Sequence, residues 1–140
     1  MKSLLPPPSR RALVLIDPPY EQKDDYQRVT DFLLAAHQRF ASGTYMLWYP
    51  MLPRAEAKQL PNRLQALGDA LQKSSRQTSW LQLQLILDQE QEDFGMYGSG
   101  IFILNPPYSL PQILNQLMPW LVKKLDTSGH GSFSLETAIL

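Results

Sequence analysis

The feature that most constrains the fold is a short apolar run that ends on a carboxylate and two prolines. Residues 12–16 (Ala-Leu-Val-Leu-Ile) are followed by Asp17, Pro18, Pro19 and Tyr20. A short continuous apolar run bounded by turn residues is typical of a strand buried on both faces, as in a parallel sheet. The prolines have no backbone N–H and cannot continue a ladder. We therefore expect Asp17 at the carboxyl edge of the sheet, where open α/β sheets bind ligands.

Length and composition indicate one globular domain spanning residues 1–140. Hydrophobic residues make up 44% of the chain and charged residues 19%, which favours a packed core. No apolar run approaches the ~20 residues of a membrane span, and residues 1–9 are too short and proline-rich for a secretory signal. The chain has no cysteine, which excludes disulfides and thiolate metal sites. We expect a cytoplasmic protein with no metal site.

The charge is balanced overall but unevenly distributed. Residues 1–80 carry 11 Lys and Arg against 7 Asp and Glu, whereas residues 81–140 carry 2 against 6. A mild basic bias in the half that holds Asp17 is compatible with phosphate contacts. Arg10 and Arg11 could touch phosphate, although a solvated pair in front of a buried strand is the favoured interpretation.

A strand–helix–strand unit follows from the next segments. Asp24 or Asp25 could cap a helix that runs to about residue 40, and a second strand is expected at residues 44–50. Such a unit is parallel and right-handed, so Tyr49 should emerge at the same edge as Asp17. Tyr49 could line a pocket there or simply pack in the core, and the sequence leaves both alternatives open. His37 is expected at the surface or at its boundary.

The rest of the chain predicts a hairpin between two further helices. A helical segment at 54–73 should be interrupted at Pro61. Residues 80–87 alternate in polarity over their first six positions, which indicates a strand with one wet face, and residues 101–104 should return antiparallel. The glycines of 95–100 are interpreted as the hairpin loop. A helix at about 110–125 and a final edge strand at 133–139 complete the pattern.

A second proline pair follows the hairpin strand, at residues 105–108 (Asn-Pro-Pro-Tyr). An antiparallel strand delivers its carboxyl end to the opposite edge of the sheet from Asp17. We therefore expect Asn105 to be structural and Asp17 to be functional.

The Asp-Pro-Pro-Tyr segment at 17–20 resembles the motif of S-adenosylmethionine-dependent amino-methyltransferases that modify adenine N6, which begins with Asp or Asn. Adenine's exocyclic amine is a poor nucleophile. The Asp17 carboxylate and the Pro18 carbonyl would accept its two N–H groups and favour a nitrogen whose lone pair can attack a methyl group. Tyr20 would stack on the extracted base.

The resemblance extends over nearly the whole chain to the bacterial 23S ribosomal RNA adenine N6-methyltransferases. It rests on residues 4–11, 17–21, 40–50, 98–107 and 119–121. It implies S-adenosylmethionine as cofactor, 23S ribosomal RNA as partner and a Rossmann-like class I methyltransferase fold, of which this chain is the second half. Site roles follow for catalytic Asp17, Pro18 and Tyr20, for Pro19 and Tyr49 in the base pocket, and for Asp17 beside the cofactor.

The glycine-rich cofactor-binding half of that fold has no counterpart in residues 1–140. The strand at 12–17 would then lack a neighbour and expose an apolar edge, which invites pairing with another chain. We expect this polypeptide alone to bind cofactor poorly and to self-associate through residues 12–17. The alternative function is a non-catalytic α/β binding or assembly module that keeps the turn at 17–20 as structure.

Overall fold

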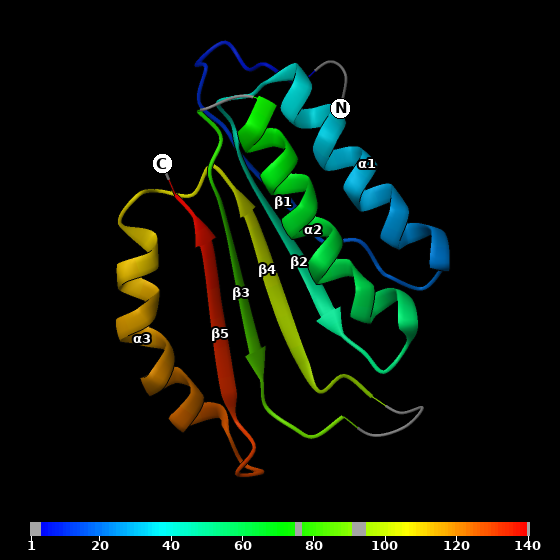
Figure 1. The fold of residues 1–140 in the computed structure, drawn as a ribbon, viewed down its shortest axis with the longest axis vertical. Helices are drawn as coiled ribbons and strands as arrows, with labels where there is room; N and C mark the ends of the chain where they lie inside the picture. Colours follow the sequence, from blue (N-terminus) through cyan, green and yellow to red (C-terminus); the bar gives the residue numbers. More distant parts are fainter. Residues whose placement is uncertain (1–3, 75–76, 91–94, 140) are drawn as a thin grey trace.

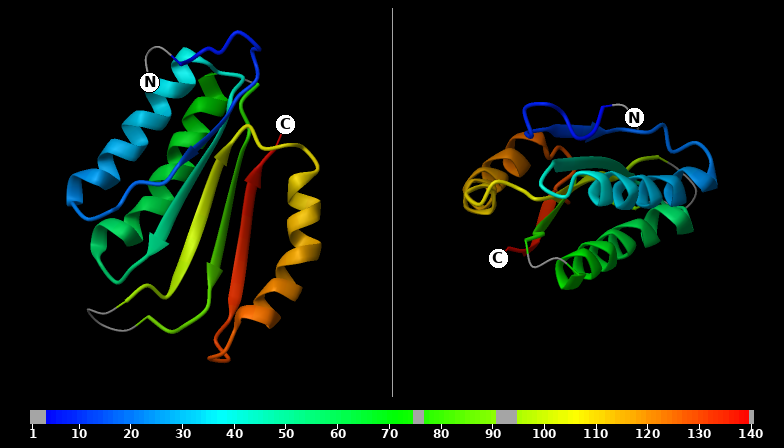
Figure 2. Two further views of the ribbon diagram at one scale, coloured as in Figure 1. Left: turned by 180° about the vertical axis from the view of Figure 1, so that it is seen from behind. Right: turned by 90° about the horizontal axis from the view of Figure 1, so that it is seen from above.

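The computed structural model describes residues 4–74, 77–90 and 95–139, which form a mixed five-stranded sheet with helices on both faces (Figure 1). The strands are β1 (Leu13–Ile16), β2 (Thr44–Met51), β3 (Trp80–Ile86), β4 (Gly98–Leu104) and β5 (Ser132–Ala138). The helices are α1 (Lys23–Arg39), α2 (Ala55–Ser74) and α3 (Leu110–Leu125). Helices α1 and α2 cover one face and α3 the other, as the view from above shows (Figure 2). No helix of the described chain is long and apolar enough to cross a membrane.

The sheet order is β1-β2-β4-β3-β5. Strand β1 is parallel to β2, while β4 is antiparallel to both β2 and β3, and β5 is antiparallel to β3. The structure confirms the predicted parallel unit, the antiparallel hairpin and the final edge strand. It follows that β1 and β2 end at one edge of the sheet, at the bottom of Figure 1, and that β4 ends at the other.

The prediction that β1 is buried on both faces is wrong. Val14 and Ile16 pack against the core beneath α1 and α2, but Leu13 is 66% and Leu15 67% exposed. Helix α3 packs over the other end of the sheet, where Met118 joins an apolar cluster with residues of β3 and β4. No element of the described ranges covers the second face of β1, so its leucines face solvent.

The alternation of residues 80–85 predicted that the polar face of β3 would be exposed to solvent. This prediction is wrong, because the face is covered by protein. Gln82 is 3% exposed and its amide donates to the Pro61 carbonyl at 3.2 Å, while Gln84 donates to the Tyr49 hydroxyl at 3.2 Å. Helix α2 covers this face and its backbone accepts from Gln82. The predicted interruption at Pro61 is also wrong, because α2 runs continuously through that residue.

The glycines of residues 95–100, which were predicted to form the hairpin loop, lie mostly within β4. Gly98 and Gly100 lie within β4, and only Gly95 lies in the connection that the structure describes. A Cβ at Gly100 would fall 2.1 Å from the Tyr49 ring. Glycine is needed there because the tyrosine of the neighbouring strand occupies the space of a side chain.

His37 lies in the interior and not at the predicted surface. It is buried, and its Nε2 lies 2.9 Å from the Thr78 Oγ1. Burial lowers the pKa of the imidazole, which favours the neutral ring.

At the start of α1, the Asp25 carboxylate accepts the Gln22 N–H at 3.0 Å, so Asp25 caps the helix from inside its first turn.

Candidate functional site

Asp17 lies directly after β1 at the open edge of the sheet, and it is exposed. Strand β1 ends with Ile16 beside Leu47 of β2, and β2 continues to Met51. The end of β2 therefore projects beyond the Asp17 loop at the same edge. The segment Leu52–Arg54 leads from there into α2. This edge combines an exposed carboxylate with two loops that follow parallel strands, which is where α/β sheets bind ligands.

Tyr20 holds the Asp17 loop against β2. Its hydroxyl donates to the Trp48 carbonyl at 2.7 Å, its ring centroid lies 5.1 Å from that of Tyr26, and it is only 3% exposed. Burial raises the pKa of the phenol, helped by Tyr26 and by the Asp17 carboxylate. Tyr20 has a φ of 53°, in the left-handed region that non-glycine residues rarely adopt. Stacking of Tyr20 on a base would require the ring to leave the core.

The other predicted pocket residues divide between surface and interior. Pro19 is exposed and Pro18 half-buried beside Asp17. Tyr49 is fully buried between α2 and the sheet, where it accepts a hydrogen bond from Gln84. Burial raises the pKa of its hydroxyl. Of the two alternatives for Tyr49, the structure shows core packing, because its position in β2 directs the ring to the face that α2 covers.

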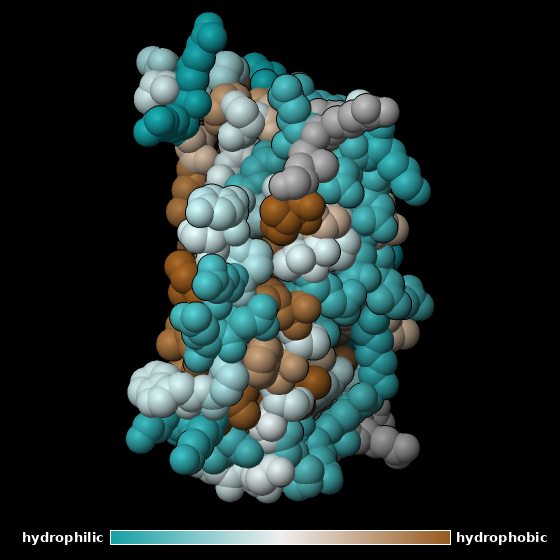
Figure 3. All heavy atoms as spheres, turned by 60° about the vertical axis from the view of Figure 1, so that its left-hand side comes forward, coloured by the Kyte–Doolittle hydropathy of each residue, from teal (hydrophilic) through white to brown (hydrophobic). Residues whose placement is uncertain are grey.

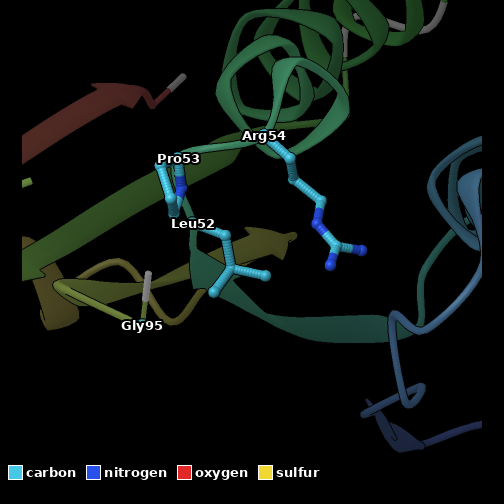
Figure 4. Close-up of a pocket in the computed structure, with 4 residues that line it drawn as sticks. All are labelled: Leu52, Pro53, Arg54 and Gly95. Carbon is cyan, nitrogen blue, oxygen red and sulfur yellow. The ribbon is translucent and has the colours of Figure 1, made fainter. Parts of the chain in front are cut away.

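Two hollows lie at the edge of the sheet where β1 and β2 end. One of about 290 Å³ is lined by Leu52, Pro53, Arg54 and Gly95 (Figure 4). The other, of about 180 Å³, lies between β1 and α1 and is lined by Ile16, Pro18, Asp25, Arg28, Val29 and Phe32. The sequence analysis missed Leu52–Arg54, although their position just after a parallel strand could have indicated them. Within the described ranges, no group of three His, Asp or Glu side chains could hold a metal ion.

Asn105 lies at the opposite edge and has a structural role, as its antiparallel strand predicts. Its side-chain amide donates to the carbonyls of Ala41 at 2.7 Å and Gly43 at 2.8 Å, and its oxygen accepts the Ser79 N–H at 3.4 Å. These bonds join the loop before β2, the loop before β3 and the end of β4. The side chain is engaged by the protein and is not offered to a ligand.

We expect the change Asn105→Ala to destabilise the fold without altering any activity of the Asp17 edge. The variant loses both amide hydrogen bonds and places alanine at a φ of 53°, which together should lower the free energy of unfolding by about 2–3 kcal/mol. Urea unfolding followed by circular dichroism measures the loss. Asn105→Gly is the matched control, because it removes the bonds but relieves the backbone. Unchanged stability of Asn105→Ala would contradict the assignment.

Comparisons with known proteins agree on one family. A family model described as RsmJ, "Ribosomal RNA large subunit methyltransferase D, RlmJ", matches residues 1–138. The chain is 42% identical over 131 residues to ribosomal RNA large subunit methyltransferase J of Escherichia coli (strain K12), which covers 94% of this chain and 44% of the relative. The Haemophilus influenzae protein of the same name is 39% identical over 136 residues, with 97% and 46% covered.

A solved structure shares the fold over nearly the whole chain. The crystal structure of protein LPL1258 from Legionella pneumophila matches with a TM-score of 0.77 and 29% identity, over 97% of this chain and 47% of that one. The chain spans about half the length of the curated relatives it matches, and the matched part is their carboxyl-terminal half.

Proposed function

This chain belongs to the family of ribosomal RNA large subunit methyltransferase J, as the resemblance of its motifs predicts, and on that premise we propose that it acts in S-adenosylmethionine-dependent methylation of adenine N6 in 23S ribosomal RNA. We propose further that it is the carboxyl-terminal part of a Rossmann-like class I methyltransferase domain. The mixed α/β sheet with helices on both faces is consistent with such a domain. Ribosomal RNA as substrate would place the protein in the cytoplasm.

The observation that carries the proposal is the exposed Asp17 carboxylate on a rigid strand end. Tyr20 fixes the loop through its hydrogen bond to Trp48, and the prolines limit backbone freedom, so the carboxylate is positioned before substrate arrives. In the proposed reaction the Asp17 carboxylate and the Pro18 carbonyl accept the two N–H groups of the adenine amine. The nitrogen lone pair then forms the new N–C bond as the methyl–sulfur bond breaks, and the surplus N–H proton is lost to water.

The described residues provide only part of a cofactor site. S-adenosylmethionine would supply the methyl group, and Asp17 would border it. The hollow between β1 and α1 holds about 180 Å³, below the ~300 Å³ at which pockets begin to enclose molecules of this size. The remaining cofactor contacts are therefore expected from the half of the enzyme that the relatives have in addition.

The proposal is tested with a chimera. This chain replaces the matched carboxyl-terminal segment of the Escherichia coli relative, and the purified protein is incubated with S-adenosylmethionine and 23S ribosomal RNA from a strain lacking the modification. We expect N6-methyladenosine in the digested RNA, detected by mass spectrometry. An unaltered Escherichia coli enzyme is the positive control. A folded chimera without methylation would favour the alternative, a binding or assembly module that keeps the turn at 17–20 as structure.

Self-association through β1 is a separate part of the proposal. Among the described strands, β1 pairs with β2 alone, and Leu13 and Leu15 project from its uncovered face, which suits pairing with a second copy. Apolar side chains are also exposed on α3 and lie among hydrophilic ones on the face shown in Figure 3.

We expect the change Leu15→Lys to shift the isolated 140-residue chain from dimers toward monomers in sedimentation velocity, because it introduces a charge at the edge. Leu117→Lys on α3 is the matched control, since Leu117 is 44% exposed and α3 packs against β5, which lies at the other end of the sheet from β1. A chain that is monomeric at high micromolar concentration before any change would contradict self-association.

A further inference from the structure

Arg54 stands at the Asp17 edge of the sheet, where β2 leads into α2. It is exposed, and it lines the hollow of about 290 Å³ with Leu52, Pro53 and Gly95. Figure 4 shows its side chain extending from the start of α2 into the space beyond the end of β2. The volume of the hollow lies at the lower limit of pockets that hold small ligands, ~300 Å³.

Three other cations near this edge are paired with carboxylates, whereas Arg54 has no carboxylate partner in the described part of the chain. Lys23 pairs with Glu56 at 3.3 Å, Arg28 with Asp25 at 3.7 Å, and Lys58 with Glu90. Over residues 4–74, 77–90 and 95–139, no carboxylate oxygen lies within 4.0 Å of the Arg54 guanidinium. Its charge is therefore available to an anion from outside this part of the chain.

Tyr26 of α1 lies beside Arg54. Tyr26 is 1% exposed, and burial raises the pKa of its phenol, while the nearby Arg54 guanidinium opposes the rise through its charge and a side-chain hydrogen bond. A guanidinium carries five N–H donors in a fixed fork, so a contact with one hydroxyl leaves donors for an oxygen-rich anion.

The RNA substrate of the proposed reaction would be bound more tightly if a cation stood near Asp17. Every nucleotide carries a phosphate, and a base that contacts Asp17 brings its flanking phosphates toward an exposed carboxylate. The negative charges of the phosphate and of the Asp17 carboxylate repel each other. A guanidinium can hold a phosphate in a two-pronged contact and offset this repulsion.

We propose that Arg54 binds an RNA phosphate next to the target adenosine and so positions the base at Asp17. This inference rests on the proposed function and adds a positioning residue on the loop after β2. Arg54 contacts the substrate backbone and takes no part in bond making.

The test measures binding of a fluorescein-labelled, adenine-containing single-stranded RNA of about ten nucleotides to the 140-residue chain by fluorescence anisotropy at several salt concentrations. We expect Arg54→Ala to raise Kd about tenfold at low salt. Loss of one phosphate contact on a single strand should make the dependence of log Kd on log salt shallower by about 0.7. Arg54→Lys should retain an intermediate affinity. Lys73→Ala, which removes an exposed cation at the other end of α2, should change Kd less than twofold.

Kinetics of the chimera separate this inference from the proposed function. Arg54→Ala should raise KM for RNA about tenfold and leave kcat unchanged. A chimera that fails to methylate would defeat the proposed function, while an Arg54-specific loss of RNA binding would still support the phosphate contact. The inference is overturned if the unaltered chain does not bind the RNA at low salt, if Arg54→Ala binds within twofold of it, or if Lys73→Ala loses as much affinity.

Discussion

In the active chimera, Asp17→Ala is expected to reduce kcat for methyl transfer by about 10³-fold. The substitution removes a hydrogen-bond acceptor that orients the adenine amine, and the loss of a positioned catalytic group is worth about 10²–10⁴-fold. Because Asp17 is exposed, the change should leave folding intact. The measurement is single-turnover methylation of unmodified 23S ribosomal RNA at saturating cofactor.

The conservative variant Asp17→Asn separates a chemical role from a structural one. Its amide oxygen still accepts a hydrogen bond, so we expect it to retain more activity than Asp17→Ala, with a loss of about tenfold relative to the unaltered enzyme. Full activity of Asp17→Ala would remove the basis of the assignment.

The change Tyr20→Ala is expected to lower the free energy of unfolding by about 3–5 kcal/mol. Replacing a buried aromatic ring with a methyl group leaves a cavity of this cost, and the hydrogen bond to Trp48 is lost as well. Thermal and urea unfolding measured on the 140-residue chain report the difference. Tyr20→Phe is the matched control, since it keeps the ring and loses only the hydroxyl, at a cost of about 1 kcal/mol.

The same pair of variants distinguishes the two roles available to Tyr20. If the ring anchors the loop, Tyr20→Ala loses stability and activity together, and Tyr20→Phe keeps most of both. If the ring leaves the core to stack on a base, Tyr20→Ala would lose activity with little change in stability. The ring's 3% exposure and its contact with Tyr26 favour the first result.

The order of the elements and the candidate catalytic segment were predictable from the sequence because both depend on local chemistry. Two prolines end a strand wherever they occur, and the connection after residue 87 is too short for a crossover helix, so β4 must return antiparallel. That one constraint places Asn105 and Asp17 at opposite edges. It distinguishes two motifs that are nearly identical as sequence.

The surroundings of individual side chains were decided by tertiary packing. An alternating strand indicates which residues share a face but not what covers that face. The glutamines of β3 were therefore predicted to face solvent, whereas in the structure α2 covers them. For the same reason the predicted surface position of His37 was wrong, and the sequence left Tyr49 open between a pocket and the core. The leucines of β1 show the opposite error, because they were predicted to be buried and are exposed. An apolar run indicates burial only when a neighbouring element covers it.

The sequence by itself determined where β1 stops and that a carboxylate follows it, because proline lacks the N–H that a ladder requires. Only the tertiary structure decided that Tyr20 lies in the core and that Arg54, 37 positions beyond Asp17 in the chain, reaches the same edge. Parallel strands bring their carboxyl ends together whatever the length of the helix between them. Which side chains gather at such an edge therefore depends on tertiary packing, and short-range sequence patterns do not reveal it.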